Sequence, residues 1–208
     1  MTEIVGKHLS NRVLAPPAAP VKLTEIVGQW AAKRALEVAL VGDHSVLLLG
    51  NEYGQAEELA EWGRQHGLHA QAVYPCPCSF RHAGPRECTC SPLQIVRWRE
   101  ERVPKNFDIY IAVVPPDTFQ VSDWLAGRRG EPDAVVLERV TLAKEVPIPR
   151  ELDDIARALF ESALKRGVLS ASRLPVTQRL AASVARLAGH AEITSQDVAE
   201  AMQYVVLR

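Results

Sequence analysis

The sequence lacks a long hydrophobic run and a dominant charge of either sign. No apolar stretch approaches the ~20 residues that cross a membrane as a helix, and 24 basic and 25 acidic residues leave a net charge of −1. These absences argue against a membrane protein and against nucleic-acid binding through overall charge, so a basic binding face would have to be local. The first residues also lack the charged start and apolar run of a secretion signal, and we therefore expect a cytoplasmic protein.

Cysteine is scarce and confined to one short stretch. All four cysteines stand in two Cys-x-Cys pairs around a Pro/Gly/Arg loop: Cys76, Cys78, Cys88 and Cys90. The turn residues 83–85 fold the pairs back on each other, so four thiolates can surround one structural Zn²⁺. Free thiols, disulfides across the loop, or an iron–sulfur cluster on the same thiolates are the alternatives. Four thiolates leave zinc no open position for water, so the site would not be catalytic.

The sequence also lacks a nucleophile motif, and we expect no enzymatic activity. Acidic pairs at residues 57–58 and 153–154 stand at predicted helix starts, where they favour the helix dipole without any chemistry. Trp30 and Trp62 are predicted to be packing residues. Four histidines are scattered near predicted helix ends and loops, where we expect surface or capping roles: His44, His66, His69 and His190.

What is present is a core-forming pattern in three parts. The proline-rich residues 1–22 predict an extended arm. Residues 23–116 predict an α/β core that contains the cysteine knuckle, residues 74–92. Residues 117–208 predict a helical domain, which the family resemblance given below implies is a lid. The predicted fold class is therefore α/β, with a small parallel sheet, a four-cysteine knuckle and a C-terminal helical bundle, on a chain that is 47% hydrophobic and long enough to bury a core.

The elements follow from the periodicity of apolar residues. In the first part, helices are predicted at 28–41, 55–66 and 91–102, and strands at 45–50, 70–73 and 107–114; this β–α–β order favours a parallel sheet. In the last part, a loop is predicted through Gly130. It is followed by helices at 131–145, 152–167, 175–189 and from Thr194 onward, with Ile155 among the inward residues of the second.

Three stretches in order resemble the magnesium-chelatase-like AAA+ ATPases, in particular the ComM type linked to DNA branch migration. The first carries Val-Gly-Gln at 27–29, Lys-Arg-Ala-Leu at 33–36 and a histidine with an apolar strand at 44–50. The second, more specific one matches Pro-Cys-Pro-Cys-Gly…Glu-Cys-x-Cys-(Ser/Thr)-Pro-x-Gln-Ile at 75–78 and 87–95, apart from Ser79 in the place of the glycine. The third resembles the family's helical lid at 130–131, 137–140, 169–171 and 199–204. The resemblance implies a reduced AAA+ core followed by a lid.

The departures from the family pattern concern ATP. A Walker A loop needs Gly-x-x-x-x-Gly-Lys-(Ser/Thr), because backbone amides cradle the phosphates, the lysine neutralises their charge and the hydroxyl holds Mg²⁺. The lysine and the hydroxyl residue are absent here, and Glu52, Glu57 and Glu58 add negative charge. No apolar run ending in Asp-Glu, as in Walker B, precedes the cysteines. We therefore expect no useful ATP binding, with weak adenosine binding at residues 27–29 as the alternative. The degenerate loop consists of Gly50, Asn51, Glu52, Tyr53 and Gly54.

Two functions follow from the resemblance and the departures. The first is a non-catalytic scaffold that binds a protein partner, either an intact AAA+ ATPase subunit or a second copy of the chain. The second is a zinc-containing nucleic-acid-binding module, in which Phe80 and Trp98 are available for base stacking. Arginines that pair with Glu100 and Glu101 on a solvated helix face are the alternative interpretation of its basic residues. The predicted nucleic-acid contacts are Arg81, Arg86, Arg97, Arg99 and Arg102.

Overall fold

The computed structural model describes residues 20–81 and 86–205. Most of the predicted arm and the predicted turn at 83–85 therefore lie outside the described residues. The fold class is confirmed: a small parallel sheet is packed with helices, and the C-terminal region is helical. The division at residue 116 into two domains stays a prediction. No helix in the described part of the chain is long and apolar enough to cross a bilayer.

The sheet has three parallel strands in the order β2-β1-β3. The central strand β1 (Val46–Leu49) pairs with β2 (Ala70–Val73) on one side and with β3 (Ile109–Ala112) on the other. Successive side chains of β1 point to opposite faces. Val46 and Leu48 enter the main core, while Leu47 packs in a second cluster with Phe107. Both faces of β1 are thus covered, as its unbroken apolar run predicts.

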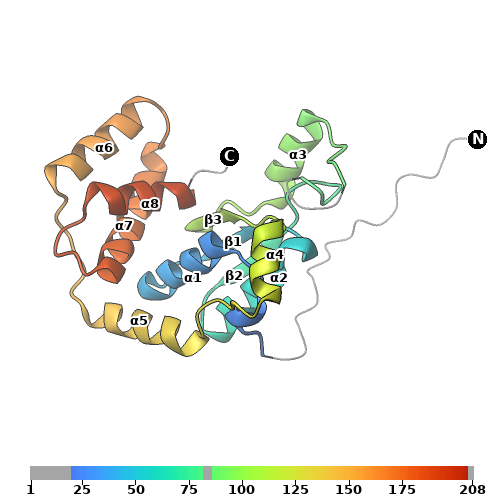
Figure 1. Ribbon diagram of the computed structural model, residues 1–208. Coiled ribbons are helices and arrows are strands. Elements are labelled where there is room, and N and C mark those ends of the chain that lie inside the picture. The colour runs from blue at the N-terminus through green and yellow to red at the C-terminus, as the bar shows by residue number, and fades with distance from the viewer. Residues whose placement is uncertain (1–19, 82–85, 206–208) are drawn as a thin grey trace, which may run out of the picture.

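Three helices accompany the strands. α1 (Trp30–Gly42) packs on β1 and β3, and α2 (Ala56–Gln65) packs on β1 and β2. α3 (Pro92–Arg102) begins with a capping box between Ser91 and Gln94, and buries only Ile95. Figure 1 shows α3 beside the cysteine stretch, projecting away from the sheet. Two 3₁₀ turns complete this part, η1 (Leu23–Glu25) and η2 (Glu52–Gly54).

The C-terminal helices form a bundle that packs on α1. α5 (Asp133–Glu145) and α7 (Leu174–Ala188) both contact α1, and α8 (Ser195–Val205) packs between α7 and α6 (Asp154–Lys165). The turn η3 (Ala171–Arg173) leads into α7. One continuous hydrophobic cluster contains residues of the sheet, α1 and the bundle. The bundle, on the left in Figure 1, and the sheet therefore share a core.

Three local predictions were wrong. The stretch predicted as a loop contains α4 (Thr118–Leu125), which a capping box between Asp117 and Gln120 starts and of which no residue is buried. Because α4 buries no residue, its sequence has no stripe of core-facing apolar residues from which the helix could be predicted. Trp30 is 59% exposed, since it shares the outer face of α1 with Lys33 rather than the buried stripe. Ile155 is 69% exposed because it lies about 100° from the inward stripe of α6 that begins at Ala156.

Candidate metal centre and nucleotide loop

The structure brings the four cysteines together. All four sulfur atoms lie within 4.8 Å of one another, and the cluster is Cys76, Cys78, Cys88 and Cys90. The Sγ atom of Cys76 lies 3.4 Å from that of Cys78 and 3.7 Å from that of Cys88. Tetrahedral zinc with Zn–S bonds of about 2.3 Å separates its sulfurs by about 3.8 Å. The four sulfurs are therefore close enough to bind one metal ion of this size after small side-chain movements.

Two of the alternatives, disulfides across the loop and an iron–sulfur cluster, fit the cluster less well than a single ion does. All four cysteines are free thiols, and the shortest sulfur separation of 3.4 Å far exceeds a disulfide bond of about 2.05 Å. A polynuclear iron–sulfur cluster places several irons and sulfides between its thiolates, which then lie further apart than sulfurs around one ion. The geometry thus favours a mononuclear site.

The thiols differ in acidity because their surroundings differ. Burial, together with hydrogen bonds to the neighbouring thiols, raises the pKa of the Cys76 thiol to about 12. Burial also acts to raise the pKa of Cys78, but the backbone N–H of Phe80 and the adjacent thiols outweigh it and lower the pKa to about 6. Burial raises the pKa of Cys90 as well. Cys78 is therefore the thiol most ready to bind a cation as a thiolate.

The backbone conformation of the turn after Cys78 explains why the family pattern has glycine at the position of Ser79. Ser79 has φ of 68°, in the left-handed region where a residue with a side chain is strained. Its N–H donates to the carbonyl of Cys76, which closes a tight turn around the first thiol pair. Its own carbonyl accepts a hydrogen bond from Nδ2 of Asn51, at 2.8 Å. The cysteine cluster is thereby joined to the loop that follows β1.

That loop is closed on itself by hydrogen bonds centred on Asn51, which is fully buried. Oδ1 of Asn51 accepts the N–H of Tyr53, and its backbone carbonyl accepts the N–H groups of Gly54 and Ala56. The N–H of Gln55 donates to the carbonyl of Glu52. A phosphate-binding loop turns such amides outward toward its ligand. Here the four successive N–H groups are already paired within the protein.

The glycines of the loop allow close packing against Val113, the residue that follows β3. A Cβ added to Gly50 would lie 2.7 Å from the carbonyl oxygen of Val113, and one added to Gly54 would lie 3.0 Å from the same residue. Of the acidic residues, Glu52 is exposed on the loop, whereas Glu57 is buried and pairs with Arg64 at 2.5 Å. Glu57, which was expected to add negative charge, lies in α2, where the guanidinium group of Arg64 balances it.

The residues predicted to contact nucleic acid lie partly beside the cysteine turn and partly on α3. Arg81 and Arg86 flank the cysteine turn, and the guanidinium of Arg86 lies 5.9 Å from the ring of Phe80. Arg97 and Arg102 are exposed on α3, and Arg102 lies 5.9 Å from the ring of Trp98. Arg99 is half-buried, and burial together with the nearby charge of Arg81 lowers its pKa. The two aromatic rings that were expected to stack on bases are thus in contact with arginines of the same chain.

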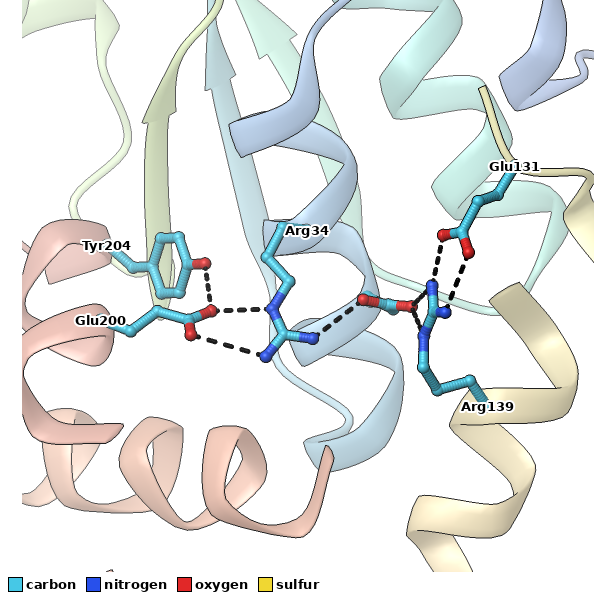
Figure 2. Close-up of polar contacts among 6 residues, drawn as sticks. Arg34, Glu131, Arg139, Glu200 and Tyr204 are labelled. Atoms are coloured by element: carbon cyan, nitrogen blue, oxygen red, sulfur yellow. Dashed lines mark hydrogen bonds and ion pairs between the residues drawn. The ribbon is translucent and has the colours of Figure 1, made fainter. Parts of the chain in front are cut away.

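A ladder of ion pairs joins the bundle to α1, and sequence reasoning missed it. Figure 2 shows Tyr204 and Glu200 of α8 facing Arg34 of α1, and Glu131 facing Arg139 of α5. Glu37 links the two ends. Its side chain is 6% exposed, and it accepts hydrogen bonds from Arg34 at 3.0 Å and from Arg139 at 2.6 Å. The partners are up to 166 residues apart in sequence, so only the alternation of acidic and basic residues on α1 and α5 hints at it.

The histidines divide into surface and buried groups. His69 is exposed and His66 bonds the carbonyl of Trp62, as expected for a surface or helix-end residue. His190 contacts Asp197, which accepts the N–H of Thr194 at the start of α8. His44 was predicted wrongly, because it is only 3% exposed. It lies at the junction of α1 and β1, where α7 covers it.

Two profiles of known protein families match parts of this chain. The family profile described as magnesium chelatase, subunit ChlI, matches residues 22–61, which contain η1, α1, β1 and the closed loop. The profile described as magnesium chelatase, subunit ChlI C-terminal, matches residues 130–205, which contain the bundle. A search of curated proteins found no match. The ladder in Figure 2 joins the two matched segments, which together make up more than half of the chain. The chain therefore belongs to the magnesium chelatase ChlI family, as a short magnesium-chelatase-like member.

Proposed function

We propose that this protein is a non-catalytic member of the family that binds a protein partner, and that the partner is an intact AAA+ ATPase. The observation that carries the proposal is the closed loop after β1. Its amides, the groups that would hold phosphates, are paired with Asn51 and Glu52. The lysine and hydroxyl side chains of a Walker A loop are absent as well.

The packing of the bundle supports the same proposal. In an ATPase cycle, a lid changes its position relative to the core as nucleotide binds and leaves. Here the bundle shares a hydrophobic cluster with the sheet, and Glu37 is held between arginines of α1 and α5. Glu37 is buried but its arginine partners are partly exposed, so breaking these pairs costs about 2 kcal/mol. A fixed bundle suits a scaffold that presents a constant surface to a partner.

The first test is ATP binding by calorimetric titration with Mg²⁺ at about 0.1 mM protein, with phosphate release measured in parallel. We expect neither heat of binding nor turnover. A dissociation constant in the low micromolar range (about −8 kcal/mol), or turnover abolished by a substitution within residues 50–54, would return the protein to the ATPases.

The second test is co-purification of the tagged protein from its native host at moderate salt, with identification of what is retained. An AAA+ subunit in stoichiometric amount supports the proposal. Nucleic acid alone would support the alternative function, and recovery of the chain by itself in repeated preparations would contradict both.

For the cysteine cluster we propose a structural Zn²⁺. Four sulfur donors and their mutual separations suit zinc, which prefers tetrahedral thiolate sites. When bound, the ion would hold the two Cys-x-Cys pairs together. Elemental analysis of protein purified without chelator tests this: one equivalent of zinc is expected. Finding iron in the same amount would identify iron as the bound ion, and finding no metal would contradict the proposed site.

One observation favours the nucleic-acid alternative. The segment 81–105 is locally basic in an otherwise slightly acidic chain, and Arg97 and Arg102 of α3 are exposed. Lysine and arginine contacts with phosphates weaken with salt in a characteristic way, because counterions are released. Anisotropy of a labelled single-stranded oligonucleotide, with Arg97→Gln compared with the distant Arg157→Gln, tests it. Binding that only Arg97→Gln weakens would establish this surface, and no binding at low salt would exclude it.

A further inference from the structure

A groove of about 460 Å³ lies at the opposite end of β1 from the closed loop. His44, at its floor, precedes β1, whereas residues 50–54 follow it. One wall is apolar and consists of Ile148, Pro149 and Pro175. We call this hollow the α7 groove, because α7 supplies Pro175 and several other lining residues. Its position separates it from the cysteine cluster and from the nucleotide loop.

Two buried polar side chains form the floor. Nε2 of His44 lies 2.9 Å from Oγ of Ser183, and the two residues are 3% and 4% exposed. Oγ of Ser183 donates to the carbonyl of Arg179, so in the neutral tautomer Nε2 of His44 carries the hydrogen and donates to Oγ. A Cβ added to Gly42 would lie 2.2 Å from both atoms. Glycine at position 42 is what lets this pair reach the groove.

The groove is strongly basic. Arg150, Arg179 and Arg186 line it, and no acidic residue does so in the described part of the chain. Nitrogen atoms of Arg186 donate to the carbonyls of Val41, Lys144 and Val146, so its charge is fixed in place without a carboxylate.

One carboxylate, that of Asp108, lies close to groove residues although it does not line the groove. Asp108 lies 3.3 Å from Arg179 and 3.6 Å from Nδ1 of His44. Three guanidinium groups against this one carboxylate leave two positive charges uncompensated. Arg150 is exposed and has no side-chain partner among the described residues. Two other hollows differ, because one is lined by Glu37 and Glu131 and the other by Glu138.

We propose that the α7 groove binds a small phosphate ester. Its dianionic head would match the two uncompensated charges and accept hydrogen bonds from the guanidinium groups of Arg150 and Arg179. Its organic body would lie along the wall of Ile148, Pro149 and Pro175. The volume of about 460 Å³ is in the range of small-molecule sites. A ligand there would connect the segment between α5 and α6 to α7, and would stabilise the bundle by mass action.

The test uses the full chain and phenyl phosphate as the probe, in about 150 mM NaCl so that exposed charges are screened. Calorimetric titration is expected to show one site, and inorganic phosphate should bind several-fold more weakly because it lacks the apolar body. Arg150→Gln should weaken phenyl phosphate binding at least about fivefold. Arg157→Gln removes an exposed arginine from α6, outside the groove, and should leave the affinity unchanged.

NMR locates the bound probe independently of the variants. The ring resonances of His44 are expected to shift on addition of phenyl phosphate, and those of the exposed His69 are not. The proposal is overturned if phenyl phosphate does not bind at about 10 mM, which corresponds to a binding free energy weaker than about −3 kcal/mol. Equal losses in Arg150→Gln and Arg157→Gln also overturn it, as do shifts confined to α3. None of these results depends on whether the chain binds an AAA+ partner.

Discussion

Replacing Glu37 with glutamine is the sharpest test of how the bundle is held. The substitution keeps the size of the side chain and removes one buried negative charge. Glu37 accepts hydrogen bonds from Arg34 at 3.0 Å and from Arg139 at 2.6 Å, and its side chain is 6% exposed. In the variant, one amide oxygen remains as an acceptor, while the amide NH₂ faces a guanidinium group. We expect the bundle to loosen from α1.

The magnitude follows from the contacts. Removing one partner of a fully buried ion pair costs about 3–5 kcal/mol. Here the arginines are 35% and 38% exposed, so water partly replaces the lost contacts and the cost is smaller. Arg34 also keeps Glu200, and Arg139 keeps Glu131. We therefore expect a loss of about 2 kcal/mol in the free energy of unfolding, or about 4–8 °C in Tm for a chain of this length.

Urea unfolding followed by circular dichroism measures the loss, and Glu138→Gln is the matched control, because Glu138 is an exposed residue of α5. The double-mutant cycle of Glu37→Gln with Arg139→Gln should give a coupling energy of about 1 kcal/mol or more. Hydrogen exchange should show faster exchange in α5 and α8 than in β1. If Glu37→Gln and Glu138→Gln lose the same small amount, the ladder does not hold the bundle and the argument for a fixed lid is refuted.

Three further predictions concern the knuckle and the buried histidine. Cys88→Ser should release the metal and lower Tm, because metal binding energy is part of folding; an unchanged zinc content by elemental analysis would contradict this. Ser79→Gly should raise the free energy of unfolding by about 0.5 kcal/mol, since glycine relieves the strain at φ of 68° at a smaller entropic cost; a loss of stability in urea would count against it. Burial lowers the pKa of His44, and Arg179 lowers it further against the opposing charge of Asp108. The folded state thus binds fewer protons than the unfolded state, so the free energy of unfolding should fall as pH falls below about 6.5. Between pH 7.5 and 5.5, the His44→Gln variant should lose less stability than the unmodified protein. Parallel pH profiles of the two proteins would exclude a buried, neutral His44.

The fold was largely readable from local pattern. β2 lies where it was predicted, and α3 begins at the capping serine before Pro92. The starts of α6 and α8 follow from Asp153 and Thr194, whose side chains bond helical N–H groups. α4 was missed because its residues face solvent, and a helix without a buried stripe has no hydrophobic period to read. Burial-driven signals therefore identified the elements that form the core, and the Ser91–Pro92 start identified α3.

The site was readable in part, for a related reason. The cysteines are close in sequence, so their spacing alone indicated that they meet, and they do. Glu37 and Arg139 are 102 residues apart, and His44 and Ser183 are 139 apart. No local spacing encodes such pairs, because they depend on how α1 packs against α5 and α7. The sequence accordingly predicted the local knuckle and placed a buried histidine on the surface.

The closed loop after β1 and the cysteine turn are joined by hydrogen bonds through Asn51. Asn51 closes the loop by accepting the N–H groups of Tyr53, Gly54 and Ala56, and its side-chain amide donates to the carbonyl of Ser79. That carbonyl is positioned by the turn between the thiols. An ordered knuckle therefore favours the closed loop, and the closed loop in turn fixes the first cysteine pair against β1.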